Sequence, residues 1–586
     1  EPNTPLSATF PEAMLGCSNA LSYIPDEPLT LWSNEEGYGR NPVDVGNYGA
    51  NYSNVFLLGN GRLGIATECN QSEGILINEK TNYDSNPDPD HKYVNTGTYC
   101  PIGALKITRG GESPAHGSTF LRQLDLTTAV ASAMNRWTAS GKEKIYTREY
   151  LVSRANDVGV LHFTTNGEVK LNYSFESSIA GSGSEGLVSA TSGNTSNCRI
   201  RFNLTFKVIQ KGGSLTTSGS TVSVTDADEI TVVFGVGTNY DIDSPTFYSG
   251  ESDDRLAERV RSTVESAAAL GWQALYDNHI AEYSPLFNAA RFELAEATNN
   301  APTSLLKQHY EKAYTPTAAD SDDQTRMIDM LLFAMGRYLN LASSRGDLAL
   351  PSNLQGIWAN QSPQWNCDFH ANINLQMNYW AAENTNISSA HMPFLNYLKK
   401  MAATQWKGYA DKLVAGTGGW THHFATNTFG ASGVYNGEYT EAAAWNCTHI
   451  WQHYLYTQDR QFLADFFDTL YGAARFYFGY LRDTDGDGLL EIPNNYSPEL
   501  AGGTSVAVHA QQLVYQHLCN TRNAAVILGK TAEAANCQSY IDRMYNGIDI
   551  VNGEQCEWKG ALTSEPTHRH LSHLMCLYPL AQVSPY

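Results

Sequence analysis

The hydrophobic pattern changes its period once along this chain of 586 residues, near residue 253. Before that point, short runs of alternating apolar and polar residues recur, such as Lys144–Val152 and Ile200–Ile209. Clusters rich in Gly, Ser, Asn and Asp separate these runs. Alternation with turn-forming clusters, and no helical segments between the runs, is typical of a β-sandwich. Residues 1–253 are therefore predicted to form an N-terminal β-sandwich domain.

Helical periodicity begins at residue 254 and continues almost to the last residue. Residues 254–322 are predicted to be a helical linker, with helices over Asp254–Leu270 and Trp272–Phe287. About eight helices are expected from residue 323 onward, among them Met327–Ala342, Asn374–Glu383, Phe394–Leu413, Glu441–Tyr456, Arg460–Arg482, Val506–Leu528 and Ala532–Tyr545. Their long, polar and aromatic connections favour an (α/α)6 toroid over a compact bundle. Because six helix pairs need about twelve helices, we expect the toroid of residues 323–586 to be incomplete at its C-terminal end.

The charge balance excludes several classes of partner. The formal charge is −22, which makes nucleic acid and anionic membrane surfaces unlikely partners. The sequence contains no run of about 18 apolar residues, so no membrane span is expected. Aromatic residues make up 11% of the chain, which is compatible with sugar binding but does not establish it.

Three features predict a secreted protein made by a eukaryotic secretory route. The sequence starts at Glu1 without an initiator Met, as after removal of a signal peptide. The cysteines number ten, an even count without a Cys-x-x-Cys pair, which favours disulfides. Nine Asn-x-Ser/Thr sequons predict N-glycans, although some sequons arise by chance. They lie at Asn51, Asn70, Asn172, Asn194, Asn203, Asn360, Asn386, Asn446 and Asn495.

The densest polar cluster lies between Trp365 and Trp380. If this segment is extended, His370, Asn372 and Asn374 point to one side, because side chains in a strand alternate. An imidazole and two amides on one face can donate hydrogen bonds to sugar hydroxyls and accept hydrogen bonds from them. The alternative is a helix start with structural asparagines.

Two further clusters could carry chemistry. Glu499 follows Ser497-Pro498 in an aromatic loop and is a candidate general acid, whereas most loop glutamates are simply solvated. The segment His568–His573 holds three histidines whose spacing fits no common zinc pattern, so sugar recognition by Arg569 and His570 is the better interpretation. His422, in Trp420–His423, has the same character.

A weaker calcium candidate comprises Asp483, Asp485 and Asp487, which resemble the first half of a calcium loop. Asn494 stands where an EF-hand places its bidentate Glu. The alternative is an Asp/Gly turn after a helix.

Four motifs in one order resemble glycoside hydrolase family 95, the inverting 1,2-α-L-fucosidases. They are Asn353–Trp358, His370–Trp380, Ser497–Glu499 and His568–Leu574. The resemblance implies a β-sandwich, a helical linker, an (α/α)6 catalytic barrel and a small C-terminal β domain. It also implies a fucosylated oligosaccharide or glycan as substrate, and acid/base cleavage of a glycosidic bond requires no cofactor.

The resemblance assigns roles to residues of this chain. Glu499 matches the general acid, and Asn374, with Asn372 beside it, matches the amide that positions the attacking water. Substrate contacts are expected from His370, Trp358, His422, Arg569 and His570.

One element of the family pattern is not found in this sequence. In the family an Asp within a late Asp-Gly-Asn segment polarises the water-holding amide, and no such segment follows Glu499 here. We therefore expect either an incomplete or processed chain, with the remainder supplied as another chain, or a barrel that is open and inactive. The functional hypotheses are a secreted exo-α-L-fucosidase, an α-L-galactosidase on the same scaffold, or a non-catalytic glycan-binding or structural glycoprotein.

Overall fold

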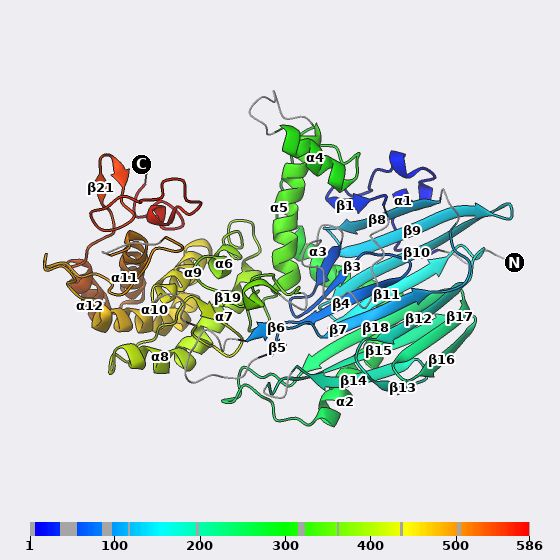
Figure 1. The fold of residues 1–586 in the computed structure, drawn as a ribbon, viewed down its shortest axis with the longest axis horizontal. Helices are drawn as coiled ribbons and strands as arrows, with labels where there is room; N and C mark the ends of the chain where they lie inside the picture. Colours follow the sequence, from blue (N-terminus) through cyan, green and yellow to red (C-terminus); the bar gives the residue numbers. More distant parts are fainter. Residues whose placement is uncertain are drawn as a thin grey trace.

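The computed structural model describes residues 6–35, 55–84, 97–114, 118–194, 198–313, 323–359, 363–433, 438–500 and 506–584. A β-sandwich and a helical domain lie on opposite sides of the long helix α5 (Asp323–Ser343), as Figure 1 shows. The prediction of an N-terminal sandwich followed by a helical domain is therefore confirmed. Sequons Asn51 and Asn360 lie outside the described residues.

Two antiparallel sheets form the sandwich. The nine-stranded sheet has the order β1-β8-β9-β10-β11-β18-β15-β14-β13, and the seven-stranded sheet has the order β16-β17-β12-β7-β4-β3-β2. The first sheet comprises β1 (Thr30–Ser33), β8 (Thr119–Asp125), β9 (Val130–Ala139), β10 (Lys142–Ser153), β11 (Val158–Thr165), β13 (Ser182–Ser184), β14 (Leu187–Gly193), β15 (Arg201–Lys211) and β18 (Glu229–Thr238). The second comprises β2 (Phe56–Gly59), β3 (Leu63–Thr67), β4 (Glu73–Glu79), β7 (Gly103–Arg109), β12 (Leu171–Ser177), β16 (Ser214–Ser218) and β17 (Thr221–Ala227). A separate pair, β5 (Tyr83–Asp84) and β6 (Thr98–Tyr99), points towards the helical domain (Figure 1).

Strand β12 illustrates how the sequence pattern produces the sandwich. Its residues are alternately buried and half-buried, with Leu171, Tyr173 and Phe175 in the core. The rings of Phe163 and Phe175 meet at 5.9 Å between the two sheets. Because alternate side chains of a strand point to opposite faces, one apolar residue in two is sufficient to build this core.

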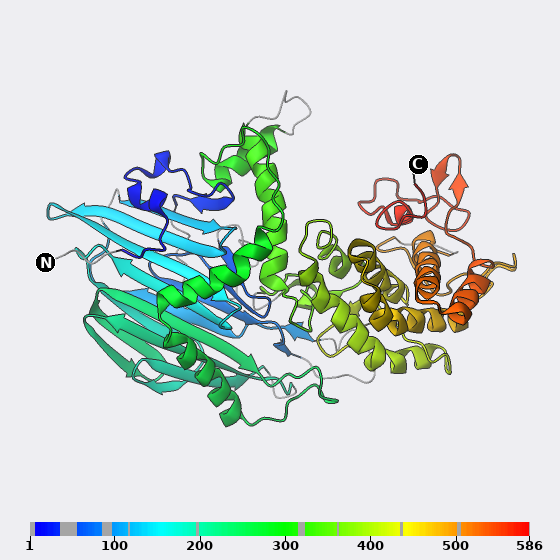
Figure 2. The same ribbon diagram turned by 180° about the vertical axis from the view of Figure 1, so that it is seen from behind.

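The two helices predicted as a linker cover one sheet of the sandwich. Helices α2 (Asp253–Ala268) and α3 (Trp272–Phe287) lie across its face in Figure 2. The buried side chains of α2 pack on Val160 and Val233 of the nine-stranded sheet. A Cβ atom at Gly237 would lie 2.7 Å from Val260, so glycine allows this close approach. Helix α4 (Thr303–Ala313) follows and packs on α5.

The helical domain contains eight helices among the residues that the structure describes, in agreement with the predicted number. After α5 come α6 (Asn374–Met377), α7 (Ser388–Ala403), α8 (Gln405–Leu413), α9 (Ala442–Thr457), α10 (Arg460–Tyr480), α11 (Val508–Leu528) and α12 (Thr531–Ile541). Two predictions of helix extent were wrong. The helix at Asn374 is only one turn long, and the predicted helix Phe394–Leu413 is divided at Thr404, whose φ and ψ are −124° and −90°. Short pairs β19 (Phe369–His370) with β20 (Ala425–Thr426), and β21 (Ile550–Val551) with β22 (Glu554–Gln555), lie in the loops.

Polar contacts join the sandwich firmly to the helical domain. Lys80 Nζ donates hydrogen bonds to the carbonyls of Ser343 (2.6 Å) and Leu350 (2.9 Å), and is itself buried. The Tyr99 hydroxyl donates to the Ile357 carbonyl at 2.8 Å. Buried donors that are paired across a domain boundary hold the two parts in one orientation, because separation would leave them without partners.

The expected disulfides are absent, and no described helix is long and apolar enough to cross a membrane. All ten cysteines are free, and eight of them are buried. Cys69 lies within the sandwich core and Cys447 within α9, where each packs as a small apolar side chain. The even number of cysteines thus reflects use in packing and not pairing.

Candidate active site

Glu499 lies in the loop between α10 and α11. Its backbone adopts a left-handed conformation with φ of 60°, which is uncommon for residues other than glycine and costs free energy. The loop is fixed to the segment around Glu557, because the buried Ser497 hydroxyl donates a hydrogen bond to the Glu557 carboxylate. The carboxyl group of Glu499 is half exposed, with 51% of the side chain accessible.

The structure brings Arg569 and His570 to Glu499 across seventy residues of sequence. Arg569 forms an ion pair with the Glu499 carboxylate. His570 Nδ1 contacts the Pro498 carbonyl at 3.0 Å, and its Nε2 lies 3.7 Å from Glu499 Oε2. Two of the predicted substrate-binding residues therefore flank the predicted acid.

Asn372 and Asn374 lie in a turn that opens α6. The expected extended segment is confined to β19, and the chain turns after His370, so the three side chains do not share one face of a strand. His370 Nδ1 hydrogen-bonds the buried Asp368 carboxylate at 2.8 Å, which fixes the ring. Asn372 Oδ1 is buried and has no hydrogen-bond partner among the described residues.

A series of hydrogen bonds between buried side chains, including His422, supports this turn. Gln376 Nε2 donates to the Ala371 carbonyl and to Asn446 Oδ1, both at 2.8 Å. Asn446 Nδ2 meets His422 Nε2 at 2.9 Å, and His422 Nδ1 meets the His423 carbonyl at 2.6 Å. Both ring nitrogens of His422 are therefore engaged within the protein. Its ring stacks on Trp406 at 4.1 Å, and burial lowers its pKa to about 3.

Trp358 lies at the boundary with the sandwich. Its side chain is buried, and its Nε1 donates a hydrogen bond to the Leu58 carbonyl at 2.9 Å. The structure therefore gives Trp358 and His422 positioning contacts inside the protein, whereas Arg569 and His570 stand beside the half-exposed acid.

Glu441, which sequence reasoning did not single out, is a further candidate. It directly precedes α9, and neither carboxyl oxygen has a hydrogen-bond partner in the described part of the chain, although the residue is fully buried. Burial raises the pKa of Glu441 to about 8, and the negative charge of Glu438 adds to the shift. The carboxyl group is consequently protonated at neutral pH.

Tyr496 lies between Glu441 and Glu499. Burial raises its pKa, and the charges of both carboxylates raise it further. The Tyr439 ring packs on Tyr496 at 5.5 Å, and its hydroxyl meets His509 Nε2 at 3.0 Å. The only signal for Glu441 in the sequence is an acid before a helix, which is common because it stabilises the helix N-terminus.

The calcium candidate is filled by a side chain of the protein. The ammonium group of Lys559 contacts Asp485 at 2.8 Å, Asp487 at 2.6 Å and also the buried carboxylate of Glu491. Asp483 accepts hydrogen bonds from the backbone of its own turn. Lys559 thus supplies the positive charge at this loop. Because it lies about seventy residues further along the chain, the sequence of the turn alone did not indicate it.

Together, the site presents carboxyl, imidazole, amide and guanidinium groups where α6, α9 and α11 begin. Several polar atoms at this site, including the indole Nε1 of Trp445 and His509 Nδ1, are buried without hydrogen-bond partners among the described residues. Buried polar groups without partners are costly unless a ligand completes them, and a ligand rich in hydroxyls would do so. The site is therefore suited to a ligand that presents several hydroxyl groups, such as a carbohydrate.

Comparison with known proteins identifies the family. Residues 271–586 match the model described as "Glycosyl hydrolase family 95 catalytic domain", and residues 77–243 match "Glycosyl hydrolase family 65, N-terminal domain". The first match covers more than half of the chain, and the chain belongs to glycosyl hydrolase family 95. The family predicted from the four motifs is thereby confirmed.

Relatives and solved structures agree with this assignment. The chain is 29% identical over 527 residues to a protein named "Probable alpha-fucosidase A" from Aspergillus niger, covering 83% of this chain and 63% of that protein. It is 28% identical over 396 residues to "Alpha-L-fucosidase 2" from Arabidopsis thaliana, covering 63% of this chain and 45% of that protein. The chain thus spans less than two thirds of these relatives. A solved structure from the human microbiome assigned as a kojibiose phosphorylase shares the fold, with a TM-score of 0.59, 10% identity and coverage of 90% of this chain and 71% of that one.

Proposed function

We propose that this protein is a secreted exo-glycosidase that hydrolyses terminal α1,2-linked L-fucose with inversion. The observation that carries the proposal is the assembly of Glu499 with Arg569 and His570, next to Tyr496 and the buried Glu441. The alpha-fucosidase names of the relatives support the sugar, and the family resemblance supports the linkage and the stereochemistry.

Glu499 is the general acid of this proposal. A carboxyl group that protonates the leaving oxygen must reach solvent-borne substrate, and half of the Glu499 side chain is accessible. Arg569 forms an ion pair with Glu499. A general acid must carry a proton before it can donate one, so the proposal requires that substrate binding draws Arg569 away from Glu499 and towards the sugar.

Asn374 and Asn372 hold the attacking water. An amide is not basic and cannot accept the proton of that water, so a carboxylate must complete the step. The family's Asp-Gly-Asn segment does not occur after Glu499 in this sequence, so the proposal takes the carboxylate that accepts the proton from a second polypeptide that completes the site. Glu441, protonated at neutral pH, is suited to donate a hydrogen bond to a sugar hydroxyl.

The test uses the full-length product of the gene with 2′-fucosyllactose. We expect release of fucose that first appears in NMR spectra as the β-anomer, and a loss of about a thousandfold or more in rate for Glu499→Gln. The matched control is Glu565→Gln, an exposed glutamate three residues before His568, which should keep the wild-type rate. Release of the α-anomer would refute inversion, and a near-wild-type rate for Glu499→Gln would refute the acid assignment.

Substrate choice and secretion need separate measurements. Rates on nitrophenyl α-L-fucoside and α-L-galactoside decide between the two sugars, which differ by one hydroxyl and therefore overlap in a shared pocket.

Asn386 is exposed and can carry a glycan, whereas Asn203 and Asn446 are fully buried. A mass decrease on enzymatic removal of N-glycans would support secretion, and denaturing electrophoresis would show any second polypeptide.

A further inference from the structure

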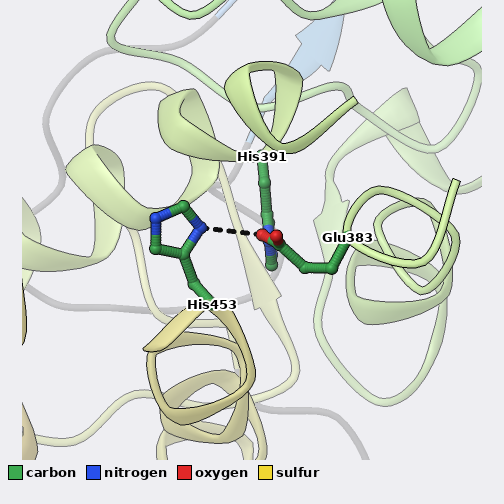
Figure 3. A group of neighbouring side chains, drawn as sticks. All are labelled: Glu383, His391 and His453. Atoms are coloured by element: carbon green, nitrogen blue, oxygen red, sulfur yellow. Dashed lines mark hydrogen bonds and ion pairs between the residues drawn. The ribbon is translucent and has the colours of Figure 1, made fainter. Parts of the chain in front are cut away.

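A second group of titratable side chains lies at the opposite end of α9. Glu383 follows α6, His391 is on α7, and His453 is on the last turns of α9. Figure 3 shows the Glu383 carboxylate next to the imidazole rings of His391 and His453. Glu441 precedes α9 and His453 lies twelve residues later, so the two are separated by about 18 Å along the helix. This cluster is therefore separate from the candidate active site.

Both histidines converge on the same oxygen atom. His391 Nδ1 and His453 Nδ1 each lie 2.7 Å from Glu383 Oε1. The Ser388 hydroxyl donates a hydrogen bond to Glu383 Oε2 at 2.7 Å and lies 3.3 Å from His453 Nδ1. The side chains of His391 and Glu383 are 0% and 5% exposed, so water cannot readily compete for these contacts.

Glu383 is a carboxylate in this environment. Burial alone would raise its pKa, but hydrogen bonds from His391 and His453 outweigh burial and hold the pKa well below its ordinary value. Burial also lowers the pKa of His391. One carboxylate oxygen and two imidazole nitrogens form the His2Glu donor set that binds zinc in proteins.

The geometry is close to that of a tetrahedral metal site. The donor atoms of Glu383, His391 and His453 all lie within 4.8 Å of one another. Ligands about 2.0–2.1 Å from a tetrahedral zinc ion stand ~3.3 Å apart, so the present 2.7 Å contacts must open by only ~0.6 Å.

The surroundings provide the support that metal ligands usually have. His391 Nε2 meets His449 Nδ1 at 2.9 Å, and His449 is buried one turn before His453 on α9. With metal on Nδ1, His391 carries its proton on Nε2 and donates it to His449 Nδ1. Such a hydrogen bond orients the ring and is typical of metal-binding histidines.

The other two candidate clusters already hold a cation of the protein. Lys559 contacts the acids of the Asp483 loop, and Arg569 contacts Glu499 beside His568 and His570. Among the residues that the structure describes, no lysine or arginine forms a hydrogen bond or ion pair with Glu383, His391 or His453. No lysine or arginine of the described residues therefore competes with an external cation for Glu383.

We propose that Glu383, His391 and His453 bind one Zn²⁺ ion, with Ser388 Oγ or a water molecule as the fourth ligand. The ion joins the segment after α6 to α7 and α9, so its role is to stabilise the helical domain and not to take part in catalysis. The proposal does not depend on the glycosidase activity.

The test titrates the EDTA-treated full-length protein with Zn²⁺ alone, followed by calorimetry and metal analysis. We expect one ion per chain and an affinity lowered about a hundredfold or more in His453→Ala and in Glu383→Gln. The control His568→Ala removes a histidine of the exposed cluster and should bind zinc like the wild type. Replacing zinc by Co²⁺ should produce the visible absorption of a four-coordinate ion.

A wild-type protein that takes up no zinc after EDTA treatment would overturn the proposal. So would zinc binding that is unchanged in both Glu383→Gln and His453→Ala, or that is lost in His568→Ala. If the variants unfold, the wild type alone still decides, because zinc should raise its melting temperature and EDTA should lower it.

Discussion

Replacing Glu441 by glutamine should change how the stability of the helical domain depends on pH. Glu441 is fully buried, and its two carboxyl oxygens have no partner in the described structure. Burial raises its pKa from 4.5 to about 8. Between these values the folded protein holds a proton that the unfolded chain releases. The resulting contribution to stability is fully present below pH 4.5 and is lost as the pH rises through 8.

The magnitude follows from the width of this window. Each pH unit between the two pKa values changes the free energy of unfolding by about 1.4 kcal/mol, so going from about pH 5.5 to about pH 7.5 costs about 3 kcal/mol. Glutamine does not titrate and has nearly the same shape. The difference in stability between wild type and Glu441→Gln should therefore shift by about 3 kcal/mol over this range. For a domain of roughly 250 residues, such as the helical domain, this difference in free energy corresponds to a shift of ~5 °C in melting temperature.

Differential scanning calorimetry of both proteins across this pH range measures the effect. Other buried groups, such as Glu73 with a pKa of about 7, titrate in the same window, but they do so equally in both proteins and cancel in the difference. Glu265→Gln, which removes an exposed carboxylate from α2, controls for the change in net charge. Melting temperatures of wild type and Glu441→Gln that run parallel from pH 5.5 to 7.5 would refute the argument that burial keeps this group protonated.

Three further predictions concern positioning contacts. Lys559→Met removes the ion-pair partner of the buried Glu491 carboxylate and should lower the free energy of unfolding by about 3 kcal/mol in urea titrations. Asp487→Asn, at the exposed side of the same cluster, should have a much smaller effect. Gly59→Ala places a Cβ atom 2.5 Å from the Ala342 carbonyl oxygen and should cost about 1–3 kcal/mol by calorimetry; Gly408→Ala, with open space in α8, should not destabilise. Asn446→Ala breaks the hydrogen bonds to Gln376 and His422, so it should destabilise the protein by about 1–3 kcal/mol. It should also slow fucose release, because these bonds support the turn that holds Asn372 and Asn374. An unchanged rate would contradict that link.

Elements with long, strong periodicity were predictable from the sequence. Helix α3 was predicted with the observed limits, and α9 and α10 were predicted within two residues at each end. Their apolar residues recur over four or more turns, so the local pattern and the tertiary packing demand the same structure. The motifs at Glu499 and His568–His573 were also identified, because each is a compact run of unusual residues.

Short elements were predicted less well. The turn between His370 and Asn374 contains too few residues for a period to be recognised, and it is held by contacts with Phe424 and, through Gln376, with Asn446. Thr404 divides α7 from α8 through its backbone angles, and the apolar pattern continues across it. In both places the conformation depends on distant neighbours.

The sequence by itself determined the two-part architecture and the family, because hydrophobic period and motif order are local properties of the chain. Only the tertiary structure decided which charges meet. It placed Arg569 on Glu499 and Lys559 on the acidic loop, and it gathered Glu383, His391 and His453 from three elements. It also buried the Glu441 carboxyl group where no other described residue hydrogen-bonds it. The physical reason is that an electrostatic environment depends on burial and on distances in space, and residues seventy positions apart become neighbours only when the helices pack.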